Sequence, residues 1–168
     1  AIIMEQTSGP SFSGQEVRLG QLYQSNGRGL ETKLRASHQG KGPNPLSFTV
    51  GYSQARQGNL KNAKRFLSNT GTQDRGMYYA VAKEFKKGRI QLDYSQYQAK
   101  RGIFEGAHVG NLSDLQRIFE RGYALAPDSF SFEIGRPYQD ITHEQLNVRS
   151  EFNLGEHYKA KSLNYKVI

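Results

Sequence analysis

The chain has 168 residues, a formal net charge of +8 at neutral pH and no cysteine. Without cysteine it has neither disulfides nor thiol chemistry, and no run approaches the ~20 consecutive apolar residues of a membrane helix. The apolar content is only 36%, but a transmembrane β-barrel needs an apolar residue only at every second position. Composition therefore leaves both a soluble domain and a membrane barrel open.

Alternation of apolar and polar residues predicts seven β-strands separated by turn residues. In LSFTVGYSQ, for example, Leu46, Phe48, Val50 and Tyr52 alternate with small or polar residues. The expected strands cover residues 14–24, 29–38, 45–56, 75–86, 89–101, 138–152 and 157–168. They are longer than the ~5–6 residues usual in globular proteins, and they match the ~9–11 residues of a tilted strand that crosses a bilayer.

The connections alternate in length from the second one onward. Short turns (QGKGPNP, KKG and LGEH) alternate with a long loop around KNAKRFLSNTGTQD and a longer one after Arg101. Outer-membrane barrels have such a short-turn end and a long-loop end. We therefore expect an all-β fold, a transmembrane antiparallel β-barrel, in preference to a soluble β-sandwich. Single-chain bacterial barrels close with an even number of strands, so seven strands indicate only part of a larger barrel.

A short helix is predicted inside the longest loop. Its apolar residues recur at helical spacing in the segment RGIFEGAHVGNLSDLQRIFERG (Leu112, Leu115, Ile118 and Phe119). Asn111 or Ser113 can cap the start of the helix, and Gly122 stands just past its expected end. Such a helix either covers the mouth of the barrel or contacts a ligand, because long outer loops carry ligand contacts.

Four motifs are longer and more unusual than the rest: YQSNGRG, FLSNTGTQDRG, RGIFEGAHVGNLSDLQRIFERG and FSFEIGRPYQDITHEQL. They span most of the chain, from about Tyr23 to Leu154. Together they resemble the TonB-dependent outer-membrane receptors, especially the iron-siderophore and haem-type members. The resemblance implies a plug inside a barrel of about 22 strands. Residues 1–10 would then end the plug or join it to the barrel, and residues 11–168 would be the first part of the barrel.

The resemblance also implies a function and a place in the cell. The protein would lie in the outer membrane of a Gram-negative bacterium and take up a ferric siderophore, ferric citrate or haem by energy-coupled transport. It would not be an enzyme, and it would need no cofactor, although its ligand could be an iron chelate. Its partners would be its own plug, the remaining barrel strands, a TonB-type energy-coupling complex and outer-membrane lipid, with a surface lipoprotein left open and no nucleic acid.

Two groups of residues are candidates for the site. The candidates for ligand contact lie in the expected outer loops: Arg65, Phe66, Asn69, Arg75, Phe104, His108, Asn111 and Arg136. Those expected to face the lumen and the plug lie on polar strand faces: Lys33, Arg35, Arg89, Asp93 and Arg149. A basic vestibule would attract an anionic ligand. No residues have the spacing of a metal site or a catalytic constellation.

A second hypothesis follows from the charge alone. A soluble β-protein with a net charge of +8 could bind nucleic acid or a polyanionic glycan. Such a protein would need no amphiphile to stay in solution, whereas a membrane barrel would aggregate without one.

Overall fold

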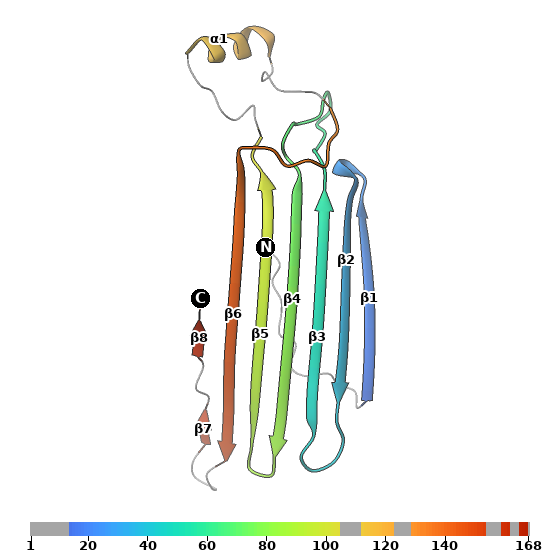
Figure 1. Ribbon diagram of the computed structural model, residues 1–168, viewed down its shortest axis with the longest axis vertical. Helices are drawn as coiled ribbons and strands as arrows, with labels where there is room; N and C mark the ends of the chain where they lie inside the picture. The colour runs from blue at the N-terminus through green and yellow to red at the C-terminus, as the bar shows by residue number, and fades with distance from the viewer. Residues whose placement is uncertain (1–13, 105–111, 123–128, 154–158, 162–164, 168) are drawn as a thin grey trace.

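The computed structural model of the protein describes residues 14–104, 112–122, 129–153, 159–161 and 165–167. It is one antiparallel sheet in which each long strand pairs with the next in sequence (Figure 1). The long strands are β1 (Gly14–Gln24), β2 (Gly29–Gln39), β3 (Leu46–Gln57), β4 (Thr72–Phe85), β5 (Gly88–Gly102) and β6 (Tyr138–Asn153). Two short strands, β7 (Lys159–Lys161) and β8 (Tyr165–Val167), both pair with β6. The expected all-β class is confirmed.

The sheet is open. Strand β1 lies at one edge, and β7 and β8 lie at the other. The first six expected strands agree with the observed ones to within three residues. The seventh, expected as one strand over 157–168, is two short strands in the described residues. The expected plug segment, residues 1–10, lies outside the described residues.

Strand β4 begins earlier than the apolar pattern indicates. Its apolar alternation starts at Met77, yet backbone pairing continues to Thr72, which lies opposite Gln57 on β3 and Arg101 on β5. A hydrogen-bonded ladder needs only backbone groups, so polar residues can extend a strand past the end of its apolar stripe.

The predicted helix is present as α1 (Leu112–Arg121). Gly122 follows it with a φ of 74°, and its N–H donates to the Ile118 carbonyl at 2.8 Å, which closes the last turn. Ser113 lies inside the helix and so is not its N-cap, and Asn111 lies outside the described residues. Among the described residues, no helix has both the length and the apolarity to span a membrane.

Connections of different length gather at the two ends of the sheet (Figure 1). At one end, which we call the turn end, residues 40–45 join β2 to β3 and residues 86–87 join β4 to β5. At the other, the loop end, residues 58–71 join β3 to β4, and residues 103–137, which include α1, join β5 to β6. The hairpin between β1 and β2, which contains the 3-10 turn η1 (Asn26–Arg28), also lies at the loop end and is short.

The register gathers apolar side chains on one face of the sheet. Residues that are Cα partners share a face, and one row of partners crosses six strands: Val17, Ala36, Val50, Tyr79, Tyr94 and Leu146. The next row toward the turn end adds Phe48, Val81, Leu92 and Val148, and the next row toward the loop end adds Leu19, Leu34, Tyr52 and Met77. We call these rows the apolar band.

The apolar band is exposed. Leu19 is 68% accessible, and Tyr79 is 44% accessible although it lies in the middle of the sheet. The only buried hydrophobic residues among those described are Ala82 and Ala99. The described residues therefore build almost no apolar core of their own.

The opposite face is polar. It carries all five residues expected to face a lumen or plug: Lys33, Arg35, Arg89, Asp93 and Arg149. Asp93 is buried, with 5% exposure. It accepts hydrogen bonds from the Tyr78 hydroxyl at 3.1 Å and from the Gln91 amide at 2.9 Å. A buried polar network, not apolar packing, thus fills the centre of this face.

Replacing Asp93 should therefore weaken the folded state. Asp93→Ala leaves the Tyr78 hydroxyl and the Gln91 amide without their acceptor, which costs about 1–3 kcal/mol of unfolding free energy. Urea unfolding in detergent micelles, followed by the far-ultraviolet circular dichroism of the strands, measures this change. Ser95→Ala, on the same face of the same strand, is the control, and equal losses in the two variants would argue against the network.

Candidate functional site

The loop end of the sheet is covered by two segments that are far apart in sequence. Residues 58–71 and 129–137 lie together above the ends of β3 to β5 (Figure 1). The Asn59 N–H donates to the Ser131 carbonyl at 2.8 Å, and the Ile103 N–H donates to the Pro137 carbonyl at 3.0 Å. We call these two segments the loop layer.

Asn69 ties the loop layer together. Its side-chain amide donates to the Ile103 carbonyl at 2.9 Å and to the Pro137 carbonyl at 2.7 Å. It is 5% exposed and adopts a left-handed φ of 56°, a conformation that asparagine tolerates well. The Asn69 amide nitrogen therefore serves the packing of the loops, and a ligand contact by Asn69 stays a prediction.

A second asparagine makes similar links. The Asn59 amide donates to the Ser129 carbonyl at 3.1 Å, and its side-chain oxygen accepts from the Thr70 N–H at 3.2 Å. Backbone polar groups of a buried loop need partners, and short amide side chains supply both donors and acceptors. Asn59 and Asn69 therefore hold the base of the loop layer in a fixed position.

The β1–β2 hairpin is joined to the loop layer. The Asn26 side chain accepts from the Lys61 N–H at 2.7 Å and donates to the Lys61 carbonyl at 3.0 Å. Gly27 accepts a backbone hydrogen bond from Gly58 at 2.8 Å. Gly27 has a φ of 78°, and a Cβ there would lie 2.6 Å from the Gln57 side chain, so this close approach requires glycine.

Aromatic rings and cations alternate on the surface of the loop layer. The Phe66 and Phe130 ring centroids are 5.8 Å apart, and Phe130 and Phe132 meet edge to face at 5.0 Å. The Arg28 guanidinium lies 4.2 Å from the Phe130 ring centroid, and the Lys61 ammonium lies 5.4 Å from that of Phe66. These are favourable ring and cation–π geometries.

The same residues line a groove of about 320 Å³. Its walls are Ser25, Asn26, Gly27, Arg28, Lys61, Asn62, Phe66 and Phe130. Two cations, two rings and several amide or hydroxyl groups suit a ligand that is anionic and partly flat. We call this groove the loop groove. It contains one sequence candidate, Phe66.

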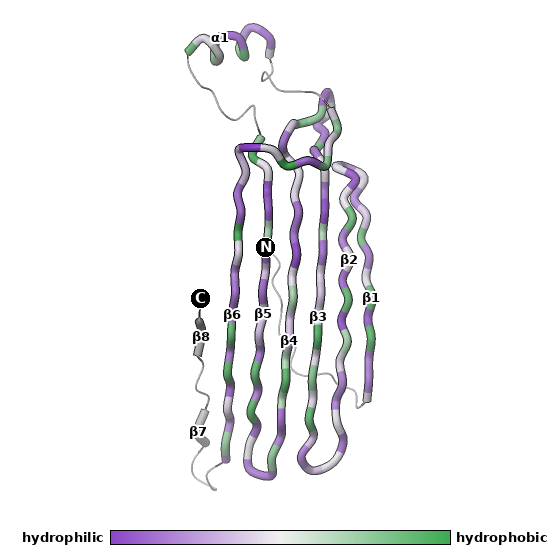
Figure 2. Tube along the Cα trace, viewed as in Figure 1, coloured by the Kyte–Doolittle hydropathy of each residue, from purple (hydrophilic) through white to green (hydrophobic). Residues whose placement is uncertain are grey.

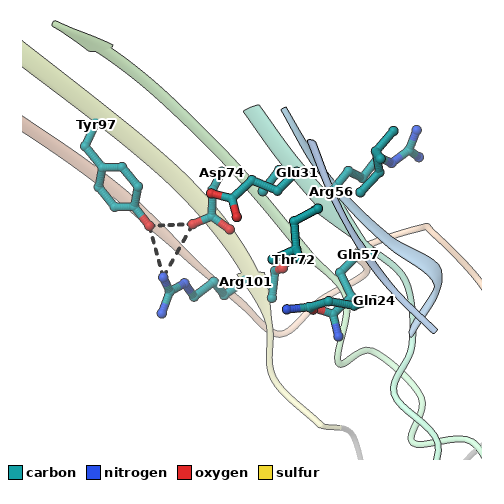
Figure 3. A pocket seen from close by; sticks show the side chains of 12 residues that line it. Gln24, Glu31, Arg56, Gln57, Thr72, Asp74, Tyr97 and Arg101 are labelled. Carbon is teal, nitrogen blue, oxygen red and sulfur yellow. Dashed lines mark hydrogen bonds and ion pairs between the residues drawn. The ribbon is translucent and has the colours of Figure 1, made fainter. Parts of the chain in front are cut away.

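A second pocket lies on the polar face just below the loop layer (Figure 3). The Tyr97 hydroxyl donates to the Asp74 carboxylate. The Arg101 guanidinium donates to the Tyr97 oxygen at 3.0 Å and lies 3.4 Å from the same carboxylate. Figure 3 shows Glu31, Gln57, Thr72 and Gln24 beside this triad, whereas Arg56 points away from it. We call it the polar-face pocket.

Tyr97 acts as a donor in this pocket. It lies beyond Tyr94, the last residue of β5 in the apolar band. Its hydroxyl hydrogen is directed at the Asp74 carboxylate, and its oxygen accepts from the Arg101 guanidinium, so the phenol links the two charged groups.

The remaining loop candidates are dispersed. Arg65 closes a turn, because its N–H donates to the Asn62 side chain at 2.7 Å. Arg75, which the sequence places in an outer loop, lies in β4 and is exposed on the same face as the apolar band. Phe104 ends a described segment, and Arg136 is exposed before Pro137. His108 and Asn111 lie outside the described residues.

Sequence reasoning missed Arg28, Phe130 and the Asp74–Tyr97–Arg101 triad. Tyr97 and Arg101 share a strand face because they are four residues apart, which the sequence does show. Asp74 joins them only because β4 pairs with β5 in the register that sets it opposite Ala99. The two-residue turn at 86–87 sets this register, because it places Phe85 opposite Gly88. The signal that could have found Asp74 is therefore the tight turn, from which the pairing is counted back to Ala99.

Comparison of the chain with protein-family models, with curated proteins and with solved structures finds no match. Within the described residues, no group of three or more His, Cys, Asp or Glu side chains is placed to hold a metal ion. The described residues of the two sites present cations, aromatic rings and hydrogen-bonding groups.

Asn69→Ala should loosen the loop layer without unfolding the sheet. It removes two hydrogen bonds to backbone carbonyls, and a loss of about 1.4 kcal/mol would raise the open population about tenfold. Trypsin cleavage after Arg65 in the folded protein, followed by mass spectrometry, measures the opening. Asn44→Ala, in a turn at the opposite end, is the control and should leave the cleavage rate unchanged. A variant that is cleaved no faster than its parent would show that Asn69 does not hold the loops.

Proposed function

We propose that this chain is the first part of the barrel of a TonB-dependent outer-membrane receptor that takes up an anionic iron chelate. The observation that carries the proposal is the apolar band. It runs at one level across six strands on the side of the sheet opposite the polar face. A surface that is apolar outside and polar inside is the pattern of a transmembrane barrel.

Water is a poor environment for this band. Apolar surface costs roughly 25 cal/mol per Å² when left in water, and monomeric soluble proteins rarely expose contiguous apolar patches above a few hundred Å². Residues such as Val17, Leu19, Phe48 and Val81 are all more than 40% exposed. Lipid chains would cover them without any partner protein.

Among the described residues, no strand pairs with the outer side of β1 or of β7 and β8, and these edges support a larger barrel. Unpaired strand edges in a bilayer cost several kcal/mol for each unsatisfied backbone group. Further strands that pair with β1 and extend the sheet beyond β7 and β8 would satisfy these groups. The polar face, with Lys33, Arg35 and the buried Asp93 network, would then turn toward a plug.

The loop end is the proposed site of ligand capture. The loop groove offers Arg28, Lys61 and two phenylalanine rings to an anionic ligand, and the polar-face pocket opens below it on the side facing the proposed plug. Ferric citrate, a ferric siderophore or haem carries negative charge. On the receptor proposal, ligand bound by the loops and plug is released inward when an energy-coupling complex in the inner membrane pulls on the plug.

A cysteine scan tests the membrane part of the proposal. The chain has no native cysteine, so a spin label reports one position at a time. Spin labels in the apolar band should be more accessible to oxygen than to a water-soluble nickel complex, because oxygen partitions into lipid; the band positions are Val50→Cys, Val81→Cys and Leu92→Cys. Spin labels on the polar face should not show this preference for oxygen; the polar positions are Thr49→Cys, Ala80→Cys and Gln91→Cys.

The scan also separates the two classes of function. Lys41→Cys, in a turn at the turn end, provides the water-exposed reference. High nickel accessibility at both faces would contradict the membrane assignment. It would favour a soluble basic β-protein that binds nucleic acid or a polyanionic glycan.

A binding experiment tests the ligand. In the full-length protein, Arg28→Gln removes one cation from the loop groove and should weaken binding of ferric citrate about tenfold or more, the effect of losing one charge-assisted hydrogen bond. Radioactive iron citrate bound to outer-membrane vesicles measures the affinity. Lys41→Gln removes the same charge at the turn end and should have no effect; equal losses in both variants would mean that only net charge matters.

A further inference from the structure

Basic residues lie next to the apolar band on its loop side. Arg56 on β3, Arg75 on β4 and Lys100 on β5 share the face of the band, since Gln73 is the Cα partner of both Arg56 and Lys100, and Arg75 is the partner of Gln54 and Gln98. We call these three residues the basic belt. Arg56 also lines the rim of the polar-face pocket, but its side chain points away from the Asp74–Tyr97–Arg101 triad (Figure 3).

The boundary between band and belt is sharp. Tyr52 and Met77 are partners at the edge of the band, and two residues further along the same strands stand Gln54 and Arg75. Figure 2 shows that the loop-side ends of β3 to β5 are hydrophilic, whereas hydrophobic residues recur along their lower parts. Neighbouring strands are ~5 Å apart, so the three charges lie in a patch about 10 Å wide.

The cations of the basic belt are not held in ion pairs by the described residues. Asp140 is the Cα partner of Lys100, yet the Lys100 ammonium lies 4.1 Å from the Tyr138 ring centroid. The Arg56 guanidinium similarly lies 5.0 Å from that of Phe132. Both rings are exposed, with 37% and 36% accessibility.

The belt also has clear limits along the sheet. On β6, the acid Asp140 is the Cα partner of Lys100 and the neutral Thr142 lies in the row of Arg75. On β2 and β1, the apolar residues Leu30 and Tyr23 lie in the row of Arg56. The positive patch therefore covers β3 to β5 alone. A local patch of this kind indicates a specific anionic partner and not a general solubilising charge.

We propose that the basic belt binds the phosphate headgroup of a lipid whose acyl chains lie along the apolar band. This rests on the proposed function, which puts the band in the bilayer. Arginine binds phosphate through two parallel hydrogen bonds. Arginine and lysine stems lie along apolar surface while their charged ends reach the headgroups, and exposed aromatic rings such as Phe132 and Tyr138 favour the same interface.

Lipid selectivity in a reconstituted bilayer tests the inference. The full-length protein is placed in phosphatidylcholine vesicles with a trace of spin-labelled phosphatidic acid or spin-labelled phosphatidylcholine. Electron paramagnetic resonance measures how much of each lipid is immobilised by the protein. We expect phosphatidic acid to be preferred, and each belt cation removed by Arg56→Gln, Arg75→Gln or Lys100→Gln to lower that preference by up to about fivefold.

Three cations at the turn end provide the matched control. A triple variant removes three positive charges from β4 and its turn, as many as the basic belt holds: Lys83→Gln, Lys86→Gln and Lys87→Gln. This variant should keep most of the preference for phosphatidic acid. The inference is overturned if the turn-end variant loses the preference for phosphatidic acid while the basic-belt variants keep it. It is also overturned if inorganic phosphate abolishes the preference in the unaltered protein, because the belt would then bind a free anion and not a lipid.

The experiment also distinguishes failure of the inference from failure of the receptor proposal. Immobilised lipid without any preference for phosphatidic acid would overturn the basic belt alone. Absence of an immobilised lipid component would mean that the band does not contact acyl chains, and both proposals would then fall.

Discussion

The two-residue period of the β-strand is the constraint on which this structure depends. Because consecutive side chains point to opposite faces, the register of six strands divides the chain into the apolar band and the polar face. A slip of one residue in any pairing would move Val50 or Tyr79 to the side of Asp93. The register is held by long ladders of backbone hydrogen bonds, since the described chain has almost no apolar core of its own.

The loop layer depends on the same register in a different way. Asn69 reaches the Ile103 and Pro137 carbonyls only because β4, β5 and β6 end at the same level. The layer in turn carries the rings that contact Arg28 and Arg56. The loop groove and the basic belt thus lie on different surfaces, but residues 129–137, which contain Phe130 and Phe132, contact both.

The sequence predicts the parts of this molecule that are local. Strands β1 to β6, the helix and Gly122 at its end follow from alternation, helical spacing and capping chemistry. The seventh strand is two short pieces in the described residues, and β4 extends past its apolar stripe to Thr72, because backbone pairing does not require apolar residues. Asn69 and Arg75 owe their surroundings to segments distant in sequence: Asn69 binds the Ile103 and Pro137 carbonyls, and Arg75, which the sequence places in a loop, lies in β4. The Asp74–Tyr97–Arg101 triad exists only in one register of β4 on β5, which the two-residue turn between these strands sets.

The hydrogen bond between Ile103 and Pro137 joins the two ends of the longest loop at its base. The chain therefore loses the conformational entropy of closing that loop when this hydrogen bond and the pairing of β5 with β6 form. Because closure entropy grows only with the logarithm of loop length, doubling the loop would add about 0.6 kcal/mol. The segment that contains α1 can consequently change in length and sequence over evolutionary time while the strands below it keep their pairing. Changes in that segment therefore cost little in the free energy of folding.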